Sequence, residues 1–279
     1  MRHIDLFFHC QIDLRILKPK AMNIHIIGGG NLGVAIALGI SKFTSGHQLT
    51  ITRRNIESIQ YLTQKGITVS SSNTQEIQKA DLVILAIKPY QVDPVLKEIT
   101  PFITHKVIAS AASGITIESL QTATQNACSI VRIMPNIAIQ FGESATCISF
   151  AEKDKIAAQP IVDLFQQLGT APVIEEKLMD AATVLGACGT AYALRYIRAS
   201  MQAGIEIGFD SQTALAIAAQ TAKGAAKMLL EEKIHPEQLI DRVTTPQGCT
   251  IVGLNEMEHQ GFSSSLIKGI KTSLNKIKE

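Results

Sequence analysis

The sequence predicts an α/β protein whose first part forms a doubly wound parallel sheet and whose second part is entirely helical. Up to about residue 174, short apolar runs alternate with helical stretches, a pattern that places helices between parallel strands. A glycine-rich turn directly follows the first of these runs. From Glu175 onwards the strand pattern stops and long segments rich in alanine and leucine take over.

Five runs are the expected strands of the sheet. The first, Asn23 to Ile27, leads straight into apolar residues that recur at helical spacing from Val34 to Ile40. The run from Asp81 to Ile87 is apolar after its first residue, as is typical of a strand buried on both faces. Ile56 to Lys65 is expected to be helical. The remaining strands are Gln48 to Thr52, Lys106 to Ser110 and Ser129 to Ile133.

Three helices are expected in the second part of the chain, with breaks at Gly208 and at the pair His235-Pro236. They run from Asp180 to Ile207, from Ser211 to Glu232 and from Pro236 to Val243. We therefore divide the chain into a sheet-containing domain, residues 22–174, and a helical domain, residues 175–279. Met22 stands immediately before the first strand, so residues 1–21 are interpreted as a tail or a mis-assigned start.

Composition argues against several classes of function. The 279 residues carry 26 Lys and Arg against 24 Asp and Glu, a formal net charge of +2, without a long basic run that would follow a nucleic acid. No apolar stretch reaches the roughly 18 residues of a membrane span. Five cysteines are scattered without a CxxC pair, so no metal site is expected. This cysteine usage is typical of the reducing cytoplasm, where we expect the protein to act.

The clearest motif is a glycine-rich turn with the spacing G-x-G-x-x-G. It lies between an expected strand and an expected helix, the context in which the pattern indicates a Rossmann-type dinucleotide site. The first glycine permits the tight turn, the second lets the backbone approach a pyrophosphate, and the third lets the helix pack closely on the strand. A glycine-rich loop without a ligand is the alternative. The residues expected to contact the cofactor are Gly28, Gly29, Gly30, Asn31, Leu32 and Gly33.

Two further segments are expected at the cofactor. About 20 residues after the last glycine, where an NAD enzyme carries an acidic residue, the chain has Arg53 and Arg54. Paired guanidinium donors match the 2′-phosphate of NADP(H), which is therefore the expected cofactor, with NAD(H) bound more weakly. A solvated turn is the alternative for this pair. Ala86, Lys88 and Pro89 follow the strongest strand, where the backbone should line the nicotinamide ribose; for Lys88 the alternative is an exposed loop lysine.

Three more segments join these motifs to a known family. They are Ser113 to Thr116, Arg132 to Asn136 and the loop Val243 to Thr250, which contains Pro-x-Gly-x-Thr. Taken in order with the glycine loop and Ala86 to Pro89, they resemble the pyrroline-5-carboxylate reductases. The resemblance covers Asn23 to about Lys271 and is specific, because the Pro-x-Gly-x-Thr loop is that family's own signature.

The resemblance implies an activity and an assembly. The expected reaction is the NADPH-dependent reduction of 1-pyrroline-5-carboxylate to L-proline by hydride transfer to the C=N carbon, the last step of proline biosynthesis. The expected assembly is a homodimer with interlocked helical domains, or a higher homo-oligomer. Each active site would then combine the nucleotide domain of one subunit with the helical domain of the other.

The resemblance also assigns roles to individual residues. Thr250 would be catalytic, with its hydroxyl reaching the ring nitrogen of the substrate, although helix N-capping is the alternative from the residues themselves. The N–H groups of Gly248, Cys249 and Thr250 precede or open an expected helix, Thr250 to Glu258, and suit the substrate carboxylate. The other positions assigned are Thr244 and Thr245, which either line the substrate pocket or cap a helix, and Glu176, which would face the cofactor.

Three positions depart from the family pattern. They are Ala138 and Thr190, each where a proline is usual, and Gln247, where a glycine is usual. A side chain at 247 could narrow the carboxylate pocket, or change the loop if the family's glycine has a positive φ.

Two rival functions remain open at this point. One is reduction of a different cyclic imine or oxidation of a β-hydroxy acid, although the latter is disfavoured because the segment from Ala187 to Ala203 lacks a lysine. The other is a catalytically silent sensor or scaffold that binds NADP. His25, within the first strand, is expected to be a packed core residue and not a base.

Overall fold

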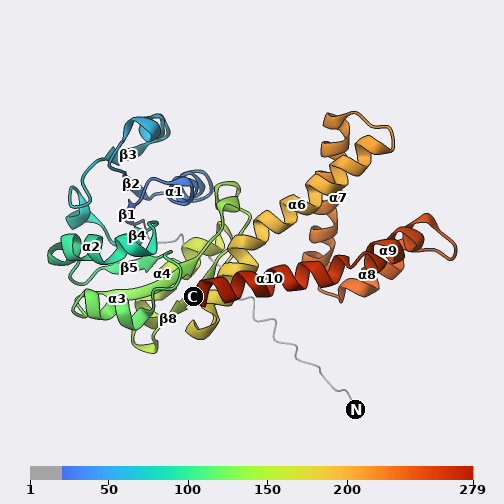
Figure 1. Cartoon of the computed structure of the whole chain (residues 1–279). Coiled ribbons are helices and arrows are strands. Elements are labelled where there is room, and N and C mark those ends of the chain that lie inside the picture. The colour runs from blue at the N-terminus through green and yellow to red at the C-terminus, as the bar shows by residue number, and fades with distance from the viewer. Residues whose placement is uncertain (1–20, 279) are drawn as a thin grey trace, which may run out of the picture.

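The computed structural model describes residues 21–278 and consists of a sheet-containing body from which a helical arm extends (Figure 1). Apart from Ala21, the predicted N-terminal tail lies outside the described residues. The arm leaves the body with α6 (Gly189–Glu206) and returns to it with α10 (Phe262–Lys278). The C-terminal end of the described chain therefore lies close to the sheet (Figure 1).

The body is built on a seven-stranded sheet with the order β3-β2-β1-β4-β5-β6-β8. The order of its first six strands is that of dinucleotide-binding Rossmann domains. The bounds of the strands are β1 Asn23–Ile27, β2 Gln48–Thr52, β3 Ile67–Ser70, β4 Leu82–Leu85, β5 Val107–Ser110, β6 Ser129–Met134 and β8 Cys147–Phe150. All five predicted strands are present, and the α/β fold class is confirmed.

The five predicted strands pair in parallel, whereas β8, which was not predicted, pairs antiparallel with β6 at one edge. A parallel neighbour needs a crossover connection, usually a helix that packs on one face of the sheet. Here only the 3₁₀ helix η4 (Ile137–Phe141) and the two-residue strand β7 (Ser144–Ala145) join β6 to β8. The chain therefore returns directly alongside β6. Strand β7 pairs separately with β9 (Gly169–Thr170).

Helices cover both faces of the sheet, as a doubly wound fold requires. Helices α1 (Asn31–Phe43) and α4 (Lys155–Gln166) contribute to the apolar cluster that contains Ile24 and Ile26 of β1. Helices α2 (Pro89–Ile99) and α3 (Ile117–Ala123) contribute to the cluster that contains Ile27. Neighbouring residues of β1 thus enter opposite cores, which follows from the two-residue period of a strand.

Residues 56–65 were expected to be helical, and the structure forms a 3₁₀ helix there, η1 (Glu57–Lys65). Its two buried side chains, Ile59 and Leu62, are three residues apart. That spacing matches the three-residue turn of a 3₁₀ helix, so this conformation places both on the core. Gly66 then ends the helix with a left-handed backbone, φ +75°.

His25 lies on β1 and is buried, with 1% of its surface exposed, as expected of a packed core residue. Neither ring nitrogen has a hydrogen-bond partner within residues 21–278. Burial lowers the pKa of His25 from 6.5 to about 4. The unfolded chain therefore takes up a proton between pH 6.5 and 4 that the folded chain does not.

Replacing His25 by leucine is expected to raise the free energy of unfolding at pH 7 by about 1–2 kcal/mol, because a buried donor and acceptor without partners are removed. The free energy of unfolding of the wild-type chain should also fall by about 3 kcal/mol between pH 7 and pH 4, because the pKa of His25 in the folded chain lies far below its value in the unfolded chain. The leucine variant should not show this decrease. Urea unfolding at pH 7, 5.5 and 4 measures both effects. Free energies of unfolding that change with pH by the same amount in the two proteins would contradict this account.

Within the described residues, the helical part consists of six α-helices, one π-helical segment and the 3₁₀ helix η6 (Glu176–Leu178). The predicted helix from Asp180 to Ile207 is interrupted by the π-helix η7 (Thr183–Cys188), and Gly208 ends it with φ +111°. Helix α8 begins at Pro236, as predicted, and the side chain of His235 caps it. The bounds are α5 Met179–Ala182, α6 Gly189–Glu206, α7 Ser211–Glu232, α8 Pro236–Val243, α9 Cys249–His259 and α10 Phe262–Lys278.

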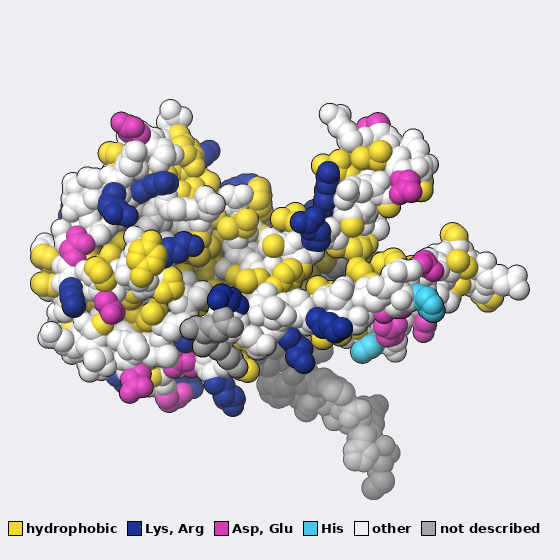
Figure 2. All heavy atoms as spheres, viewed as in Figure 1, with side chains coloured by type: hydrophobic (Ala, Val, Ile, Leu, Met, Phe, Trp, Pro, Cys, Tyr) yellow, Lys and Arg dark blue, Asp and Glu magenta, His cyan; other side chains and the backbone are white. Residues whose placement is uncertain are grey.

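The arm has little core of its own. Among the described residues of α6 to α10, only Ala214, Ala218 and Leu239 are buried. Large apolar side chains remain exposed, among them Ile207 at 75% and Leu230 at 67%. Figure 2 shows hydrophobic side chains along the arm, facing the gap between its α6–α7 branch and its α8–α10 branch. Exposed apolar area of this extent is typical of a surface that another chain covers.

A groove lies where the two branches of the arm approach each other. It has a volume of about 530 Å³ and is lined by α6 and by the α9–α10 segment, including Tyr192, Tyr196, Phe262 and Leu266. A hydrogen bond of 2.7 Å between the hydroxyls of Tyr192 and Ser273 joins α6 to α10. Within residues 21–278, no helix has the length and apolar character that crossing a membrane would require.

Candidate functional site

The glycine loop lies at the carboxyl edge of the sheet, between β1 and α1. The N–H groups of Gly28 and Gly29 both donate to the carbonyl of Thr52 at the end of β2, at 3.1 and 2.8 Å. Gly28 has φ +111°, and a Cβ atom there would lie 2.4 Å from the carbonyl oxygen of Ala86. This glycine therefore allows the loop to pack against the ends of both β2 and β4.

The other two glycines of the motif differ in what surrounds them. A Cβ atom on Gly33 would lie 1.9 Å from the carbonyl oxygen of Gly28, so α1 packs tightly against the loop. A Cβ atom on Gly30, the N-cap of α1, would meet nothing within 4 Å. The loop thus leaves open space at the N-terminus of a 13-residue helix, where N–H groups point outward. These residues fit a bound pyrophosphate.

Arg53 extends over the glycine loop from the end of β2. Its Nη1 donates to the carbonyl oxygen of Gly29 at 2.7 Å, and a Cβ atom on Gly29 would lie 3.0 Å from the Cβ of Arg53. The guanidinium is thereby held beside the loop while the side chain remains exposed. Arg54 is exposed at the adjacent position. The structure brings this part of the predicted cofactor site together at one edge of the sheet.

The segment after β4 completes that edge. Ala86 donates its N–H to the carbonyl of Ile27 at 2.8 Å, which places it beside the start of the glycine loop. Pro89 is the first residue of α2, and Lys88 is its N-cap, with an exposed side chain. The backbone N–H of Lys88 donates to the side-chain oxygen of Gln91 at 3.2 Å.

The predicted substrate loop joins α8 to α9. Gly248 is the N-cap of α9 and donates its N–H to the carbonyl of Thr245 at 2.9 Å. Cys249 and Thr250 are the first two residues of the helix, and both are exposed. Thr250 is therefore not the N-cap, so the alternative that it only caps the helix is wrong. Its hydroxyl and the N–H groups of the first turn are available to a ligand.

Thr244 and Gln247 flank the turn of this loop. Thr244 ends α8, and its hydroxyl donates to the carbonyl of Asp241 at 3.2 Å, so it acts as a helix cap in the single chain. Gln247, which stands where the family usually has a glycine, has φ +59°. A non-glycine residue in this left-handed conformation costs roughly 1–2 kcal/mol. The loop therefore keeps the backbone angle that a glycine would adopt freely.

The two loops do not meet within one chain. The glycine loop lies in the body, next to α1, whereas α8 and α9 lie towards the outer end of the arm (Figure 1). A site that uses both loops must combine two chains. The structure thus separates the predicted cofactor residues, Gly28 to Pro89, from the predicted substrate residues, Thr244 to Thr250.

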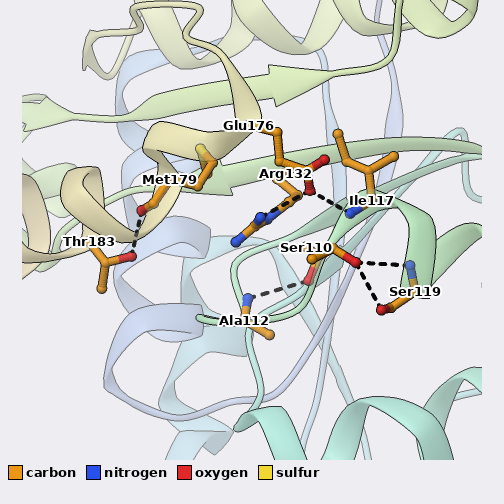
Figure 3. Close-up of polar contacts among 9 residues, drawn as sticks. Ser110, Ala112, Ile117, Ser119, Arg132, Glu176, Met179 and Thr183 are labelled. Atoms are coloured by element: carbon orange, nitrogen blue, oxygen red, sulfur yellow. Dashed lines mark hydrogen bonds and ion pairs between the residues drawn. The ribbon is translucent and has the colours of Figure 1, made fainter. Parts of the chain in front are cut away.

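Glu176 lies at the root of the arm, in the 3₁₀ helix η6 (Glu176–Leu178). Its Oε1 accepts the backbone N–H of Ile117 at 2.6 Å and pairs with Nη1 of Arg132 at 3.0 Å (Figure 3). The carboxylate that was expected to face the cofactor is thus engaged by two groups of the protein itself.

Sequence reasoning did not single out Arg132 or Asn136 as site residues, although both lie in a segment used for the resemblance. Asn136 donates its side-chain N–H to the carbonyl of Gly186 in the π-helix η7 at 3.2 Å, and its Oδ1 accepts the N–H of Ala138 at 3.0 Å. A proline at 138 could not make the second bond. A charged residue in the otherwise apolar run Ile130–Met134 was the available signal for Arg132.

The strand order, the glycine loop and the open space at Gly30 define a Rossmann-type dinucleotide-binding protein with an appended helical arm. A family model described as pyrroline-5-carboxylate reductase dimerisation matches residues 176–279. A second, described as NADP oxidoreductase coenzyme F420-dependent, matches residues 23–114. The chain belongs to the pyrroline-5-carboxylate reductase family, as its motifs predicted. This membership and the exposed apolar arm together indicate a homo-oligomer.

Individual relatives match over most of the chain. Pyrroline-5-carboxylate reductases 1 and 2 of Dictyostelium discoideum are each 44% identical over 275 residues. The alignments cover 93% and 91% of this chain; it spans 50% of the length of the first relative and 91% of the second. A solved structure of Plasmodium falciparum pyrroline carboxylate reductase with NADP bound is 26% identical and has a TM-score of 0.80. The match covers 92% of this chain and 97% of that one.

Proposed function

We propose that the protein is a pyrroline-5-carboxylate reductase that uses NADPH to reduce 1-pyrroline-5-carboxylate to L-proline, the last step of proline biosynthesis. The observation that carries this proposal is the presence, in one chain, of an open dinucleotide loop at Gly30 and a Pro-x-Gly-x-Thr loop at the N-terminus of α9. The names of the curated relatives and the NADP in the Plasmodium falciparum structure support it. The scattered cysteines favour the cytoplasm.

The site would be assembled from two chains of a homodimer, or of a higher homo-oligomer. One chain contributes the cofactor loop, Gly28 to Gly33, with Arg53 and Arg54 at the 2′-phosphate and Ala86 to Pro89 at the nicotinamide ribose. Its partner contributes the substrate loop from its helical arm. We infer that the division between the two domains lies at residues 174 and 175, because Val173 makes the last bridge to the sheet and Glu176 opens the first helix of the helical domain.

The residues of the substrate loop suit an imine that carries a carboxylate. The N–H groups of Cys249 and Thr250 at the start of α9 bind the substrate carboxylate, and Thr245 lines the pocket. The N–H of Gly248, which the sequence also suggested for this role, donates to the carbonyl of Thr245 within the loop. The Thr250 hydroxyl donates a hydrogen bond to the ring nitrogen, which makes the C=N carbon more electrophilic. When bound, NADPH supplies the hydride that adds to this carbon. The protein's task is to hold the two reactants in contact and to polarise the imine.

Oxidation of NADPH by the purified protein, followed by absorbance with 1-pyrroline-5-carboxylate as substrate, tests the proposal. Turnover with formation of proline is expected, together with slower turnover with NADH. Tight NADPH binding without turnover would overturn the proposed reaction and favour a sensor. Faster reduction of another cyclic imine would overturn the proposed substrate.

Arg53 is expected to set the preference for NADPH. Arg53→Ala should raise KM for NADPH at least about tenfold, because a guanidinium–phosphate pair is lost, and change KM for NADH much less. Arg54→Ala should have a smaller effect, since only Arg53 is anchored to the loop through Gly29. Steady-state kinetics with both cofactors measure this. An equal increase in KM for NADPH and for NADH would show that Arg53 only holds the loop in place and does not bind the 2′-phosphate.

A further inference from the structure

One carboxylate oxygen, Oε1 of Glu176, ties three segments of the chain together (Figure 3). Glu176 belongs to η6 at the root of the arm, Arg132 to β6, and Ile117 to the first turn of α3. The N–H of Ile117 would lack a partner in the helix itself, because it belongs to the first turn. The sequence separations from Glu176 are 59 residues to Ile117 and 44 to Arg132.

The ion pair is buried on the side of the arginine. The side chain of Arg132 is 4% exposed, and its Nη2 has no hydrogen-bond partner anywhere in residues 21–278. That nitrogen is also closed off from water. The positive charge of Arg132 therefore depends on Glu176 alone among the described acidic residues. A buried charge that loses its partner is strongly destabilising, so the pair holds η6 against β6.

The segments joined by this carboxylate border the carboxyl edge of the sheet. Arg132 is the register partner of Ser110 at the end of β5, and the connection from Ser110 to Ile117 runs along that edge. The hydroxyl of Ser110 accepts the N–H of Ala112 at 3.3 Å, within the same connection. On the other side, η6 continues through α5 and the π-helix into α6, the first helix of the arm.

We propose that Glu176 is a positioning residue for hydride transfer, acting through Arg132 and Ile117 to fix the root of the arm against the β5–α3 connection. This inference rests on the proposed reductase function. The arm carries the substrate loop of one chain to the cofactor of its partner, so a small rotation at its root displaces Thr250 from the C=N group. The adenosine end of the cofactor lies at the glycine loop and Arg53, outside this contact, and does not depend on Glu176.

Glu176→Gln tests the proposal in the full-length oligomer. The expected result is a fall in kcat of at least about tenfold, since misplacement of reacting groups acts on the chemical step. The dissociation constant for adenosine 2′,5′-bisphosphate, which probes only the adenosine end, should stay within about twofold of wild type. Glu175→Gln is the matched control: Glu175 pairs with Lys177 on the surface, where both side chains are more than half exposed. This control should keep wild-type kcat.

A double variant separates positioning from stability. Arg132→Met combined with Glu176→Gln removes both charges, so it should recover most of the thermal stability that Glu176→Gln alone loses. We expect its kcat to stay low, because the tie between η6 and β6 is still absent. Recovery of kcat together with stability, or wild-type kcat in Glu176→Gln, would overturn the proposal. An inactive wild-type protein would instead overturn the proposed function.

Discussion

Replacing Thr250 by valine is expected to lower kcat/KM at least about 100-fold, because the substitution removes the only group assigned to polarise the imine while keeping the shape of the side chain. Thr250 is the second residue of α9 and is exposed in the single chain, so neither the cap nor a core contact is lost. Steady-state NADPH oxidation and a separate NADPH binding titration measure the effect. Binding of NADPH should not change.

Thr250→Ser is the matched control for this experiment. It keeps the hydroxyl and should retain most of the activity, whereas near wild-type turnover in the valine variant would remove Thr250 from the mechanism. The stability of α9 is not expected to differ between the two variants, since valine and serine have similar helix propensities.

Filling the space in front of Gly30 is expected to abolish cofactor binding without unfolding the protein. A leucine there meets no atom of the chain within 4 Å of its Cβ, and the backbone angle of Gly30, φ −82°, suits any residue. Gly30→Leu should therefore weaken NADPH binding at least about 100-fold, because the side chain occupies the place of the pyrophosphate. The loss of a favourable N-cap should cost only about 1 kcal/mol of stability. Calorimetric titration and thermal unfolding measure the two effects.

Gly33→Ala provides the contrast. Its Cβ would lie 1.9 Å from the carbonyl oxygen of Gly28, so helix and loop must move apart, and both stability and NADPH binding should fall. If Gly30→Leu bound NADPH normally, the open space at this helix terminus would not be the cofactor site.

Mixing two inactive variants tests whether the site spans two chains. Thr250→Val damages only the substrate loop and Gly30→Leu only the cofactor loop. A mixed dimer has one intact site if the loops come from different chains. Random exchange of subunits should then restore about one quarter of wild-type activity, because half of the dimers are mixed and each has one intact site of two. Absence of recovery after verified exchange would show that both loops act within the same chain.

Several features of this protein follow from residues that are close together in the sequence. The spacing of Gly28, Gly30 and Gly33 determines the turn between β1 and α1. Gly28 takes a positive φ and Gly33 packs against the carbonyl of Gly28, whereas Gly30 leaves the helix terminus open. The apolar run at Leu82–Leu85 forms a buried central strand, as its composition predicted. The first turn of α9 likewise follows the Pro-x-Gly-x-Thr pattern.

Contacts between distant residues were decided only by the tertiary structure. The antiparallel strand β8 depends on how η4 and β7 turn the chain back along β6, and a run of only four residues does not reveal its direction. In the sequence, Glu176 cannot be distinguished from the neighbouring carboxylates. Only the strand order places Arg132 and Ile117 beside it. The separation of Thr250 from Gly30 follows from the direction in which the arm leaves the body (Figure 1). Sequence thus determined the local motifs, because neighbouring residues fix backbone geometry. The assembly of those motifs into a site depends on packing between elements far apart in the chain, which no single segment encodes.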